Sequence, residues 1–518
     1  MKVLTAEQMV YVDRTTIEGG TPGIDLMRNA GHAVYELIIS TLDFDKKKRI
    51  TVFTGKGNNG GDGFRAAELL VRNGYDTALF LVGMKADVKG DARVCMTDAI
   101  EAGQKIVELT GVNDLEGMKE KLSSADIIVD ALFGTGLKGE ITGLPALIID
   151  IMNDCEALIA AVDIPSGVNA STGEVSEHNV QADYTLTFGC LKAGHVYMPG
   201  RLYSGDVTVA DIGFSEKVMS SVEPFAYTLT MDEARDYIPH RAFDAHKGST
   251  GRVFIIAGSQ GMTGAAVLSS VAAMRAGAGV VTVGCPASLN DILEVKLTEV
   301  MTMPLPEVRK KRCLSLRALG MIREKVLKYD VVAVGPGLGT YGETSELVRR
   351  FISQYSGRII LDADGINAFK GDAKAIREAP CDIVITPHPG ELSTLMEMSI
   401  KDITADPIDA AKKASKAAGS VVVLKGAPTI ITDLHGTVWI NSTGNEGMAT
   451  AGMGDVLTGT IAGIAAQGLD LFDAAVLGTY VHGLAGEIAS EEKGIPGLMS
   501  GDVLETLPEA LMDIVIEL

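Results

Sequence analysis

The sequence predicts an α/β protein with two three-layer αβα domains. From residue 49 onward, short apolar runs that end in glycine alternate with amphipathic stretches, which indicates strand, loop and helix in repeated order. Units of this kind form a mostly parallel sheet with helices on both faces. The 518 residues exceed what one hydrophobic core usually supports, so we expect two domains.

The first series of expected strands ends near residue 212. Its apolar runs are RITVFTG, TALFLVG, ADIIVDALFGTG, ALIAAVDIP, ADYTLTFG and GDVTVADIG. The amphipathic stretch FRAAELLVRNG follows the first of these runs and predicts a helix. We expect these elements to form a Rossmann-like domain over residues 1–215.

A second series of strands follows a short break in the pattern. Between residues 212 and 240 the sequence is mixed in charge and has no clear period, so we place the domain boundary there. The second series consists of GRVFIIAGS, AGVVTVG, YDVVAVGPGLG, GRIILDADG, CDIVITPHPGE, SVVVLKGAP and TIITDLHGTVWI. Its runs end in loops rich in glycine or proline, where open α/β sheets hold their ligands. Residues 216–518 are therefore expected to form a second α/β domain.

Composition narrows the class of protein and its partners. The net charge of −21 argues against nucleic acid or an anionic membrane as a partner, because such surfaces need clustered Lys and Arg. The six cysteines are scattered without a C-x-x-C pair, so we expect neither disulfides nor a zinc site but a reducing, cytoplasmic compartment. The N-terminal residues lack the apolar core of an export signal, and we expect no membrane segment.

The stretch TGKGNNGGDGF, residues 54–64, matches G-x-G-x-x-G between an expected strand and an expected helix. That context is typical of a dinucleotide-binding loop. However, the next strand lacks the terminal acid that would hold a ribose, and Asp62 places a carboxylate inside the loop. With Asn58 and Asn59 beside it, the loop offers oxygen atoms that suit a cation or a hydroxylated ligand.

Three further loops are expected at the same edge of the sheet. They are residues 126–136, residues 163–167 (DIPSG) and the stretch LKAGH after TLTFG. Asp163 follows a buried-looking strand, where a carboxylate is costly unless it is paired, bound to metal or acts as an acid or base. Alone, Asp126 or Asp163 could be the cap of a helix or turn. The convergence of several such loops favours a binding site.

The motifs GKGNNGGDG, DALFGTGLKG and VDIPSG make this half similar to the N-terminal half of the bifunctional NAD(P)H-hydrate repair enzymes. In that family this half is the epimerase that interconverts the R and S hydrates of NADH and NADPH (NADHX and NADPHX). The resemblance implies that Asp163 is the catalytic acid or base and that a potassium ion lies near Asn59, Asp126 and Ser166. It implies a hydrate site made of Asn58, Asn59, Gly60, Gly61, Asp62, Asp130, Ala131, Leu132, Phe133, Gly134, Thr135, Gly136 and Asp163.

In the second half, TAGMGDVLTG, residues 450–459, comes directly before an apolar helix. Gly452 and Gly454 let successive amides point at a ligand from the helix N-terminus, which suits a phosphoryl group. Asp455 is then placed to take a proton from a hydroxyl that attacks phosphorus. The alternative is that Asp455 serves only as a helix cap.

The motifs HKGSTG, GAAVLSS, GPGLG, DADGIN, TPHPGE, KGAPT and AGMGD resemble the ribokinase-like superfamily, and in detail the ADP- or ATP-dependent dehydratase half of the same repair enzymes. The resemblance implies phosphorylation of the hydrate's hydroxyl with Mg²⁺ and then elimination, with Asp455 as the catalytic base. It implies that the nucleotide is held by Lys425, Gly426, Ala427, Pro428, Thr429 and Gly454. It implies that the hydrate contacts Ala265, Gly337, His388 and Asp455.

Two other functions fit part of the sequence. The ribokinase-like residues alone would serve a vitamin or sugar kinase fused to a nucleotide-binding domain without activity. The first domain could also be a noncatalytic binding or oligomerising module, because a protein can keep a fold after it has lost the catalytic activity. The presence of Asp62, Asp126 and Asp163 argues against both. The choice between ADP and ATP stays open, and we expect a homo-oligomer.

Overall fold

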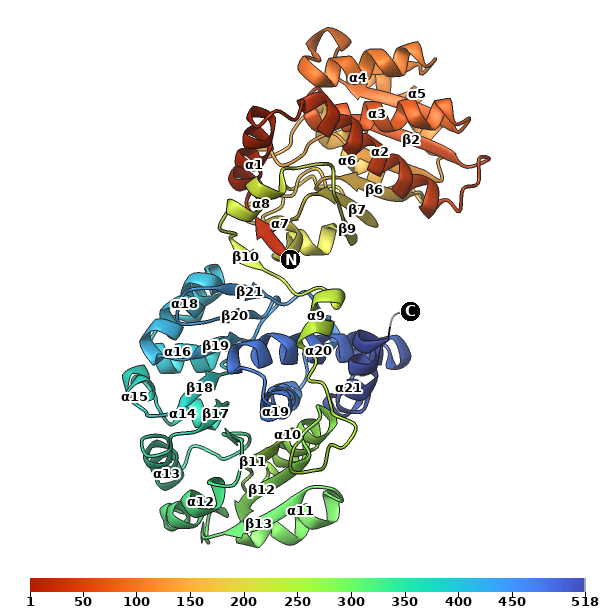
Figure 1. Ribbon diagram of the computed structural model, residues 1–518. Coiled ribbons are helices and arrows are strands. Elements are labelled where there is room, and N and C mark those ends of the chain that lie inside the picture. The colour runs from red at the N-terminus through yellow and green to blue at the C-terminus, as the bar shows by residue number, and fades with distance from the viewer. Residues whose placement is uncertain (517–518) are drawn as a thin grey trace. The chain divides into compact units, whose positions relative to one another are not determined.

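Figure 1 shows a computed structural model of the chain, which describes residues 1–516. The chain divides into two compact units between Ala226 and Tyr227. Among the described residues, no helix is both long enough and apolar enough to span a membrane.

The first unit is built on a seven-stranded parallel sheet with the order β4-β3-β2-β5-β6-β7-β9. Its strands are β2 (Arg49–Thr54), β3 (Asp76–Val82), β4 (Ile106–Leu109), β5 (Ile127–Ala131), β6 (Leu158–Val162), β7 (Tyr184–Phe188) and β9 (Asp206–Ala210). The strand order reverses between β2 and β5. In doubly wound sheets of this kind, ligands bind beside the carboxyl ends of the two strands at the reversal.

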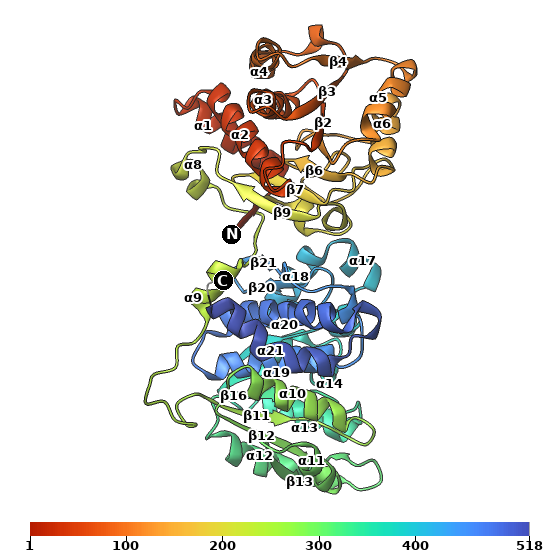
Figure 2. The same ribbon diagram turned by 90° about the vertical axis from the view of Figure 1, so that its right-hand side faces the viewer.

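Helices cover both faces of this sheet, as Figure 2 shows, with α2, α3 and α4 on one side and α5 and α6 on the other. Successive strand residues serve opposite cores: Val52 packs under α3, whereas Phe53 belongs to the core of the other face. A short pair, β1 with β8, lies outside the main sheet. The remaining elements are α1 (Ala6–Glu18), α2 (Gly23–Thr41), α3 (Asn58–Arg72), α4 (Gly90–Glu101), α5 (Leu115–Leu122), α6 (Leu144–Asn153), α7 (Ala193–Val196), α8 (Glu216–Ser221), β1 (Lys2–Leu4) and β8 (Leu191–Lys192).

The second unit contains a sheet with the order β13-β12-β11-β16-β17-β18-β19-β20-β21. All neighbours are parallel up to β19, and β20 is antiparallel to the strands on both sides. The order reverses between β11 and β16. The strands are β10 (Ala226–Tyr227), β11 (Arg252–Ile256), β12 (Val280–Pro286), β13 (Met301–Leu305), β14 (Glu307–Val308), β15 (Cys313–Leu314), β16 (Val331–Val334), β17 (Arg358–Leu361), β18 (Asp382–Ile385), β19 (Val421–Leu424), β20 (Ile430–Thr432) and β21 (Val438–Ile440).

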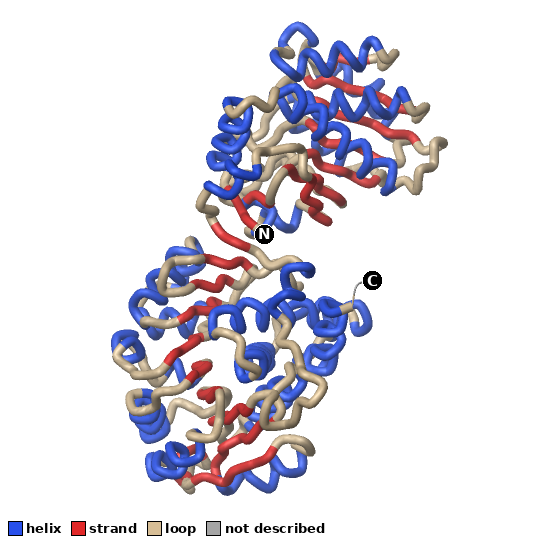
Figure 3. Tube along the Cα trace, in the orientation of Figure 1, coloured by secondary structure: helices blue, strands red, loops and turns tan. Residues whose placement is uncertain are grey.

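Helices flank the strands of the second unit on both sides (Figure 3). On one face α10 and α19 pack closely. Gly459 permits this approach, because a Cβ at that position would lie only 2.1 Å from the Ser269 carbonyl oxygen. The helices are α9 (Met231–Tyr237), α10 (Thr263–Arg275), α11 (Asn290–Lys296), α12 (Leu319–Val326), α13 (Gly342–Ile352), α14 (Asp364–Asn367), α15 (Ala373–Arg377), α16 (Pro389–Met396), α17 (Ile400–Ala405), α18 (Pro407–Ala418), α19 (Met453–Ala466), α20 (Leu471–Lys493) and α21 (Ser500–Val515).

This architecture confirms the expected α/β class and the presence of two domains. The segment just after the expected boundary packs on the first unit, since Lys2 Nζ donates hydrogen bonds to the carbonyl groups of Met219 and Val222 at 2.8 and 2.7 Å. We therefore propose a boundary near residue 226 in place of residue 215.

Candidate active sites

A cavity of about 680 Å³ lies in the first unit beside the carboxyl ends of β2 and β5. This is the position at which the strand order reverses, so the fold itself favours a ligand there. Of the residues expected in the hydrate site, the cavity is lined by Asn58, Asn59, Asp62, Leu132, Phe133, Gly134, Thr135, Gly136 and Asp163. The others, Gly60, Gly61, Asp130 and Ala131, are buried next to them in the chain.

The glycines of the loop before α3 are required by packing. A Cβ at Gly55 would lie 2.1 Å from the Leu132 carbonyl oxygen, and one at Gly60 would lie 2.0 Å from the Gly55 carbonyl oxygen. The neighbours at both positions are backbone atoms, which cannot move aside cheaply. The G-x-G-x-x-G spelling thus brings the start of α3 against the loop after β5. The free amides of that helix start favour an anionic group in the cavity.

Asp163 is held by a buried cation. Its Oδ1 accepts hydrogen bonds from Lys192 Nζ at 2.7 Å and from Thr187 Oγ1 at 3.0 Å. Burial raises the pKa of Asp163, but the Lys192 ammonium outweighs it and holds the pKa below its usual value. Asp163 also has φ of 65°, a left-handed conformation that is uncommon for a residue with a side chain. The loop therefore presents an ionised carboxylate to the cavity.

Lys192, which binds this carboxylate, is buried and contacts His195. Lys192 is 1% exposed and donates further hydrogen bonds to Thr187 Oγ1 at 2.7 Å and to the Phe188 carbonyl at 2.9 Å. The Lys192 amide donates to His195 Nδ1 at 3.1 Å. Burial and the adjacent Lys192 charge lower the pKa of His195 to about 3. His195 is therefore neutral, and the charge of Lys192 is directed at Asp163.

Asp130 and Ser166 are bound to each other behind the cavity wall. Asp130 accepts from the Ser166 amide and from Ser166 Oγ, both at 2.7 Å, and Ser166 Oγ also accepts from the Phe133 amide at 2.9 Å. Burial raises the pKa of Asp130 to about 6, against these hydrogen bonds. The side chain of Asn59 lies beside Gly134 of the same loop. These groups gather oxygen atoms of the kind that hard cations prefer.

Asp126, expected beside Asn59 and Ser166, lies elsewhere, and that prediction is wrong. It precedes β5, so it lies at the amino end of the strand, whereas the cavity is at the carboxyl end. Its carboxylate accepts from Lys48 Nζ at 3.0 Å and from the Arg49 amide at 2.8 Å, and these bonds lower the pKa of Asp126. Asp130, at the other end of the same strand, occupies the expected place.

In the second unit, α19 begins at the predicted anion-binding motif. Gly452 caps the helix with φ of 93°, and a Cβ at Gly454 would lie 3.2 Å from Lys425 Nζ. Asp455 is half-buried on the first turn. Burial, followed by the charge of Asp362, raises the pKa of Asp455 to about 7. A carboxyl group poised near neutrality is suited to accept a proton from a hydroxyl.

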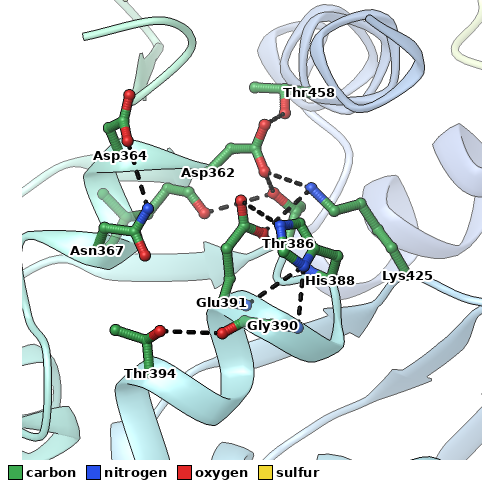
Figure 4. A network of polar contacts seen from close by, with 11 residues as sticks. Asp362, Asp364, Asn367, Thr386, His388, Gly390, Glu391, Thr394, Lys425 and Thr458 are labelled. Atoms are coloured by element: carbon green, nitrogen blue, oxygen red, sulfur yellow. Dashed lines mark hydrogen bonds and ion pairs between the residues drawn. The ribbon is translucent and has the colours of Figure 1, made fainter. Parts of the chain in front are cut away.

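Figure 4 shows that Asp362 is the centre of a polar network next to this turn. Its two oxygens accept from Lys425 Nζ at 2.7 Å, Thr386 Oγ1 at 2.7 Å and Thr458 Oγ1 at 2.8 Å. Glu391 lies 3.6 Å from the same Lys425 Nζ. Lys425 is therefore held in place by two acids, and little of its charge is left to stabilise an ionised Asp455.

The other residues expected in the second site lie on loops at the carboxyl ends of strands, except Ala265, which lies on the first turn of α10. A Cβ at Gly337 would lie 3.0 Å from the Ala265 Cβ, so these two positions are adjacent. His388 is exposed, caps α16 and lies 3.3 Å from Glu391 through Nε2. Thr429 Oγ1 donates to the Gly426 carbonyl at 3.1 Å and closes the turn between them. The roles given to these residues stay predictions.

Asp362, Glu391 and His195 were not selected as site residues from the sequence. Asp362 and Glu391 belong to the motifs DADGIN and TPHPGE, and a carboxylate directly after a buried strand was the available signal for Asp362. Lys192 and His195 lie in the LKAGH stretch, but their contact with Asp163 depends on the tertiary fold. No local pattern could have indicated it.

Together, the fold and the sites define a two-unit α/β enzyme with a buried carboxylate–lysine pair in one unit and a carboxyl group at a glycine-rich helix start in the other. Residues 23–194 match a family model described as YjeF-related protein N-terminus, and residues 253–509 match one described as NAD(P)H-hydrate dehydratase.

Full-length relatives give the same result. The bifunctional NAD(P)H-hydrate repair enzyme Nnr of Moorella thermoacetica is 41% identical over 99% of this chain and 97% of its own length. The Nnr enzyme of Coxiella burnetii is 34% identical over 96% of this chain and 97% of its own length. A crystal structure of the Bacillus subtilis ADP/ATP-dependent NAD(P)H-hydrate dehydratase, co-crystallised with ATP and Mg²⁺, is 26% identical, covers 56% of this chain and 99% of its own, and has a TM-score of 0.49. The chain belongs to the family of bifunctional NAD(P)H-hydrate repair enzymes.

Proposed function

We propose that the chain repairs hydrated NADH and NADPH in two reactions, one in each unit. The first unit interconverts the R and S hydrates, and the second dehydrates the S hydrate at the expense of ADP or ATP. The observation that carries the proposal is the presence of two separate buried acid–base centres, Asp163 with Lys192 and Asp455 with Asp362. Membership of the family supports the same division of labour.

In the second unit Asp455 acts as the base. It takes the proton of the hydrate's hydroxyl as that oxygen attacks the terminal phosphorus of the nucleotide, and the bond from this phosphorus to its bridging oxygen breaks, so that the nucleotide leaves with one phosphate fewer. The amides at the start of α19 stabilise the charge on the transferred group. The phosphorylated oxygen is then a good leaving group, and its loss with a proton from the neighbouring ring carbon restores the double bond.

The nucleotide is assigned to the loop after β19 and the start of α19. Lys425 through Thr429 form the loop, and Gly454 keeps the helix start open to a phosphoryl group. Ala265, Gly337 and His388 are assigned to the hydrate. Mg²⁺ would enter with the nucleotide, where it neutralises phosphate charge.

A potassium ion is assigned to the first unit with a corrected set of groups. Asn59 Oδ1, Asp130, Ser166 Oγ and the Phe133 carbonyl supply oxygen donors within one group of loops, and Ser166 Oγ lies 3.2 Å from that carbonyl. Asp126 is excluded by its position. The ion would supply positive charge that orders these loops around an anionic dinucleotide.

We also propose the partners, the cellular compartment and the oligomeric state of the enzyme. Its substrates NADHX and NADPHX are small molecules, and the charge of −21 disfavours nucleic acid and anionic membranes as partners. The six cysteines are free, which is consistent with a reducing cytoplasm. We also propose a homo-oligomer.

The decisive experiment uses a mixture of both epimers of hydrated NADH with Mg²⁺, K⁺ and either ADP or ATP. The return of the dihydronicotinamide absorbance reports dehydration. Complete recovery supports both activities, whereas recovery of the S fraction alone, beyond the slow spontaneous rate, contradicts the epimerase. No recovery together with phosphorylation of a vitamin or sugar alcohol would favour the kinase alternative.

A further inference from the structure

The cavity of the first unit holds a second buried carboxyl group, Asp62, in surroundings unlike those of Asp163. Asp62 lies near the start of α3, lines the cavity and is 8% exposed. Within residues 1–516, its carboxyl group receives no hydrogen bond and forms no ion pair. Asp163, on the same cavity wall, is bound by the Lys192 ammonium at 2.7 Å. One carboxyl group has a cation and the other has none.

The charged groups that act on the Asp62 carboxyl group are acids, although Lys56, Lys138 and Lys192 line the same cavity. Asp163 follows β6, Asp13 lies on α1, and the buried thiol of Cys95 lies on α4. Met27 of α2 and Ala92 of α4, which belong to the apolar core, lie beside the adjacent Gly61. Burial first, then the charges of Asp163 and Asp13, raise the pKa of Asp62 well above its usual value. The surroundings of Asp62 therefore favour the protonated acid, whereas those of Asp163 favour the carboxylate.

We propose that Asp62 and Asp163 are the acid and the base of a ring-opening epimerisation, with Lys192 as the positioning residue that keeps Asp163 a carboxylate. This inference rests on the epimerase function proposed for the first unit. Two titratable groups whose surroundings push them toward opposite protonation states are the usual mark of an acid–base pair. The cavity provides such a pair beside one substrate ring.

The step balances without any co-reactant. The hydrated ring carbon bears a hydroxyl group and is bonded to the ring nitrogen. Asp163 takes the hydroxyl proton, the oxygen electrons form an aldehyde, the carbon–nitrogen bond breaks, and the nitrogen takes the proton of Asp62. Rotation of the aldehyde presents its other face to the nitrogen. The nitrogen then attacks the aldehyde carbon, and the carbon–nitrogen bond forms again. The nitrogen returns its proton to Asp62, the oxygen takes the proton held by Asp163, and the product is the opposite epimer.

An isotope experiment on the unaltered enzyme separates this route from loss and return of water. Epimerisation of a pure hydrate is followed in H₂¹⁸O, and the ¹⁸O content of the product epimer is measured over the first turnovers. Ring opening retains the original oxygen, so we expect far less than one ¹⁸O for each inversion. One ¹⁸O for each inversion would overturn the proposal. Absence of epimerisation by the unaltered enzyme would instead refute the proposed function.

Substitution of Asp62 tests the role of the acid. Asp62→Asn has the shape of the neutral acid but cannot give up a proton, so we expect epimerisation kcat to fall by about 10²–10⁴-fold. KM and the melting temperature should change little, because Asn keeps the size of the side chain and the surroundings of Asp62 favour its uncharged form. Asp62→Glu, which keeps a proton donor, should restore part of the rate. The matched control is Asp98→Asn on α4, which removes a half-buried carboxylate that is paired with Arg28 and does not line the cavity.

An Asp62→Asn enzyme that is folded and keeps half of the normal epimerisation kcat would overturn the assignment. If the variant does not fold, the isotope experiment alone decides the route. Dehydration in the second unit, measured on the S hydrate in the same samples, reports that each preparation is intact.

Discussion

At the scale of single residues, two carboxyl groups that each lie near a lysine have pKa values shifted in opposite directions. Within residues 1–516, Asp163 is the one acid paired with Lys192, at 2.7 Å, so the charge of Lys192 is available to hold Asp163 ionised. Burial, followed by the charge of Asp362, raises the pKa of Asp455 to about 7, and Lys425, which is bound to Asp362 at 2.7 Å and lies near Glu391, offsets only part of that rise. The same residue types thus give one permanent carboxylate and one that titrates near neutrality.

This contrast predicts a pH dependence for dehydration. Asp455 must be deprotonated to act as a base, so kcat/KM for the S hydrate should lose about tenfold for each pH unit below a midpoint near 7. Activity should be on a plateau above that midpoint. The profile is measured with saturating nucleotide and Mg²⁺. Asp455→Asn should remove the activity at every pH and leave epimerisation intact, and a flat profile between pH 5 and 8 would contradict the assignment.

The buried pair Asp163–Lys192 makes a prediction for stability. Lys192→Met leaves a buried carboxylate without its cation and should cost about 3–5 kcal/mol. Adding Asp163→Asn to this variant removes the uncompensated charge, so the double variant should be more stable than Lys192→Met alone. Thermal unfolding of the three proteins measures this coupling. Equal melting temperatures for the Lys192 variant and the unaltered protein would show that the pair contributes nothing.

At the scale of elements, the direction of a strand decides which of its flanking residues reach the site. Each strand residue advances the chain by about 3.3 Å, so the two ends of a five-residue strand lie far apart. Asp126 and Asp130 flank opposite ends of β5, and only Asp130 is on the side of the cavity. Two acids four positions apart in sequence therefore have unrelated roles.

The start of α3 carries a prediction about glycine. Gly60→Ala places a Cβ 2.0 Å from the Gly55 carbonyl oxygen, so the backbone must move, at a cost of about 1–3 kcal/mol. Gly57→Ala is the matched control in the same loop, because a Cβ there meets nothing within 4 Å and φ is −93°. Thermal unfolding should show a clear loss for Gly60→Ala and little change for Gly57→Ala. Equal losses would contradict the packing argument.

The sequence contained the order of the elements but not all of their contacts. Apolar runs ending in glycine located the strands, and parallel strands necessarily bring their terminal loops to one edge, so Asn59 and Asp163 could be predicted as neighbours. Asp126 was misplaced because residues 126–136 were expected to form one loop at the cavity, whereas residues 127–131 form strand β5 and leave Asp126 at its amino end. Lys192 could not be matched to Asp163, because β8 owes its position to pairing with β1 at the other end of the unit's sequence.

At the scale of the whole molecule, each site is built from one unit alone. The lining of the cavity is drawn from residues 9–214, and the network around Asp362 is drawn from residues 362–458. Neither set includes a residue from the other unit. The two reactions should therefore be separable by mutation and should share only a substrate that diffuses between sites.

Mixing two inactive variants tests this separation. Asp163→Asn keeps the second site, so alone it should recover only the S fraction of a mixed hydrate beyond the slow spontaneous conversion. Asp455→Asn keeps the first site and alone should recover nothing. An equimolar mixture should restore complete recovery of the dihydronicotinamide absorbance, because the S hydrate made on one chain can reach the other through solvent. A mixture that stops at the S fraction, while both proteins are folded, would mean that the two sites must act within the same chain.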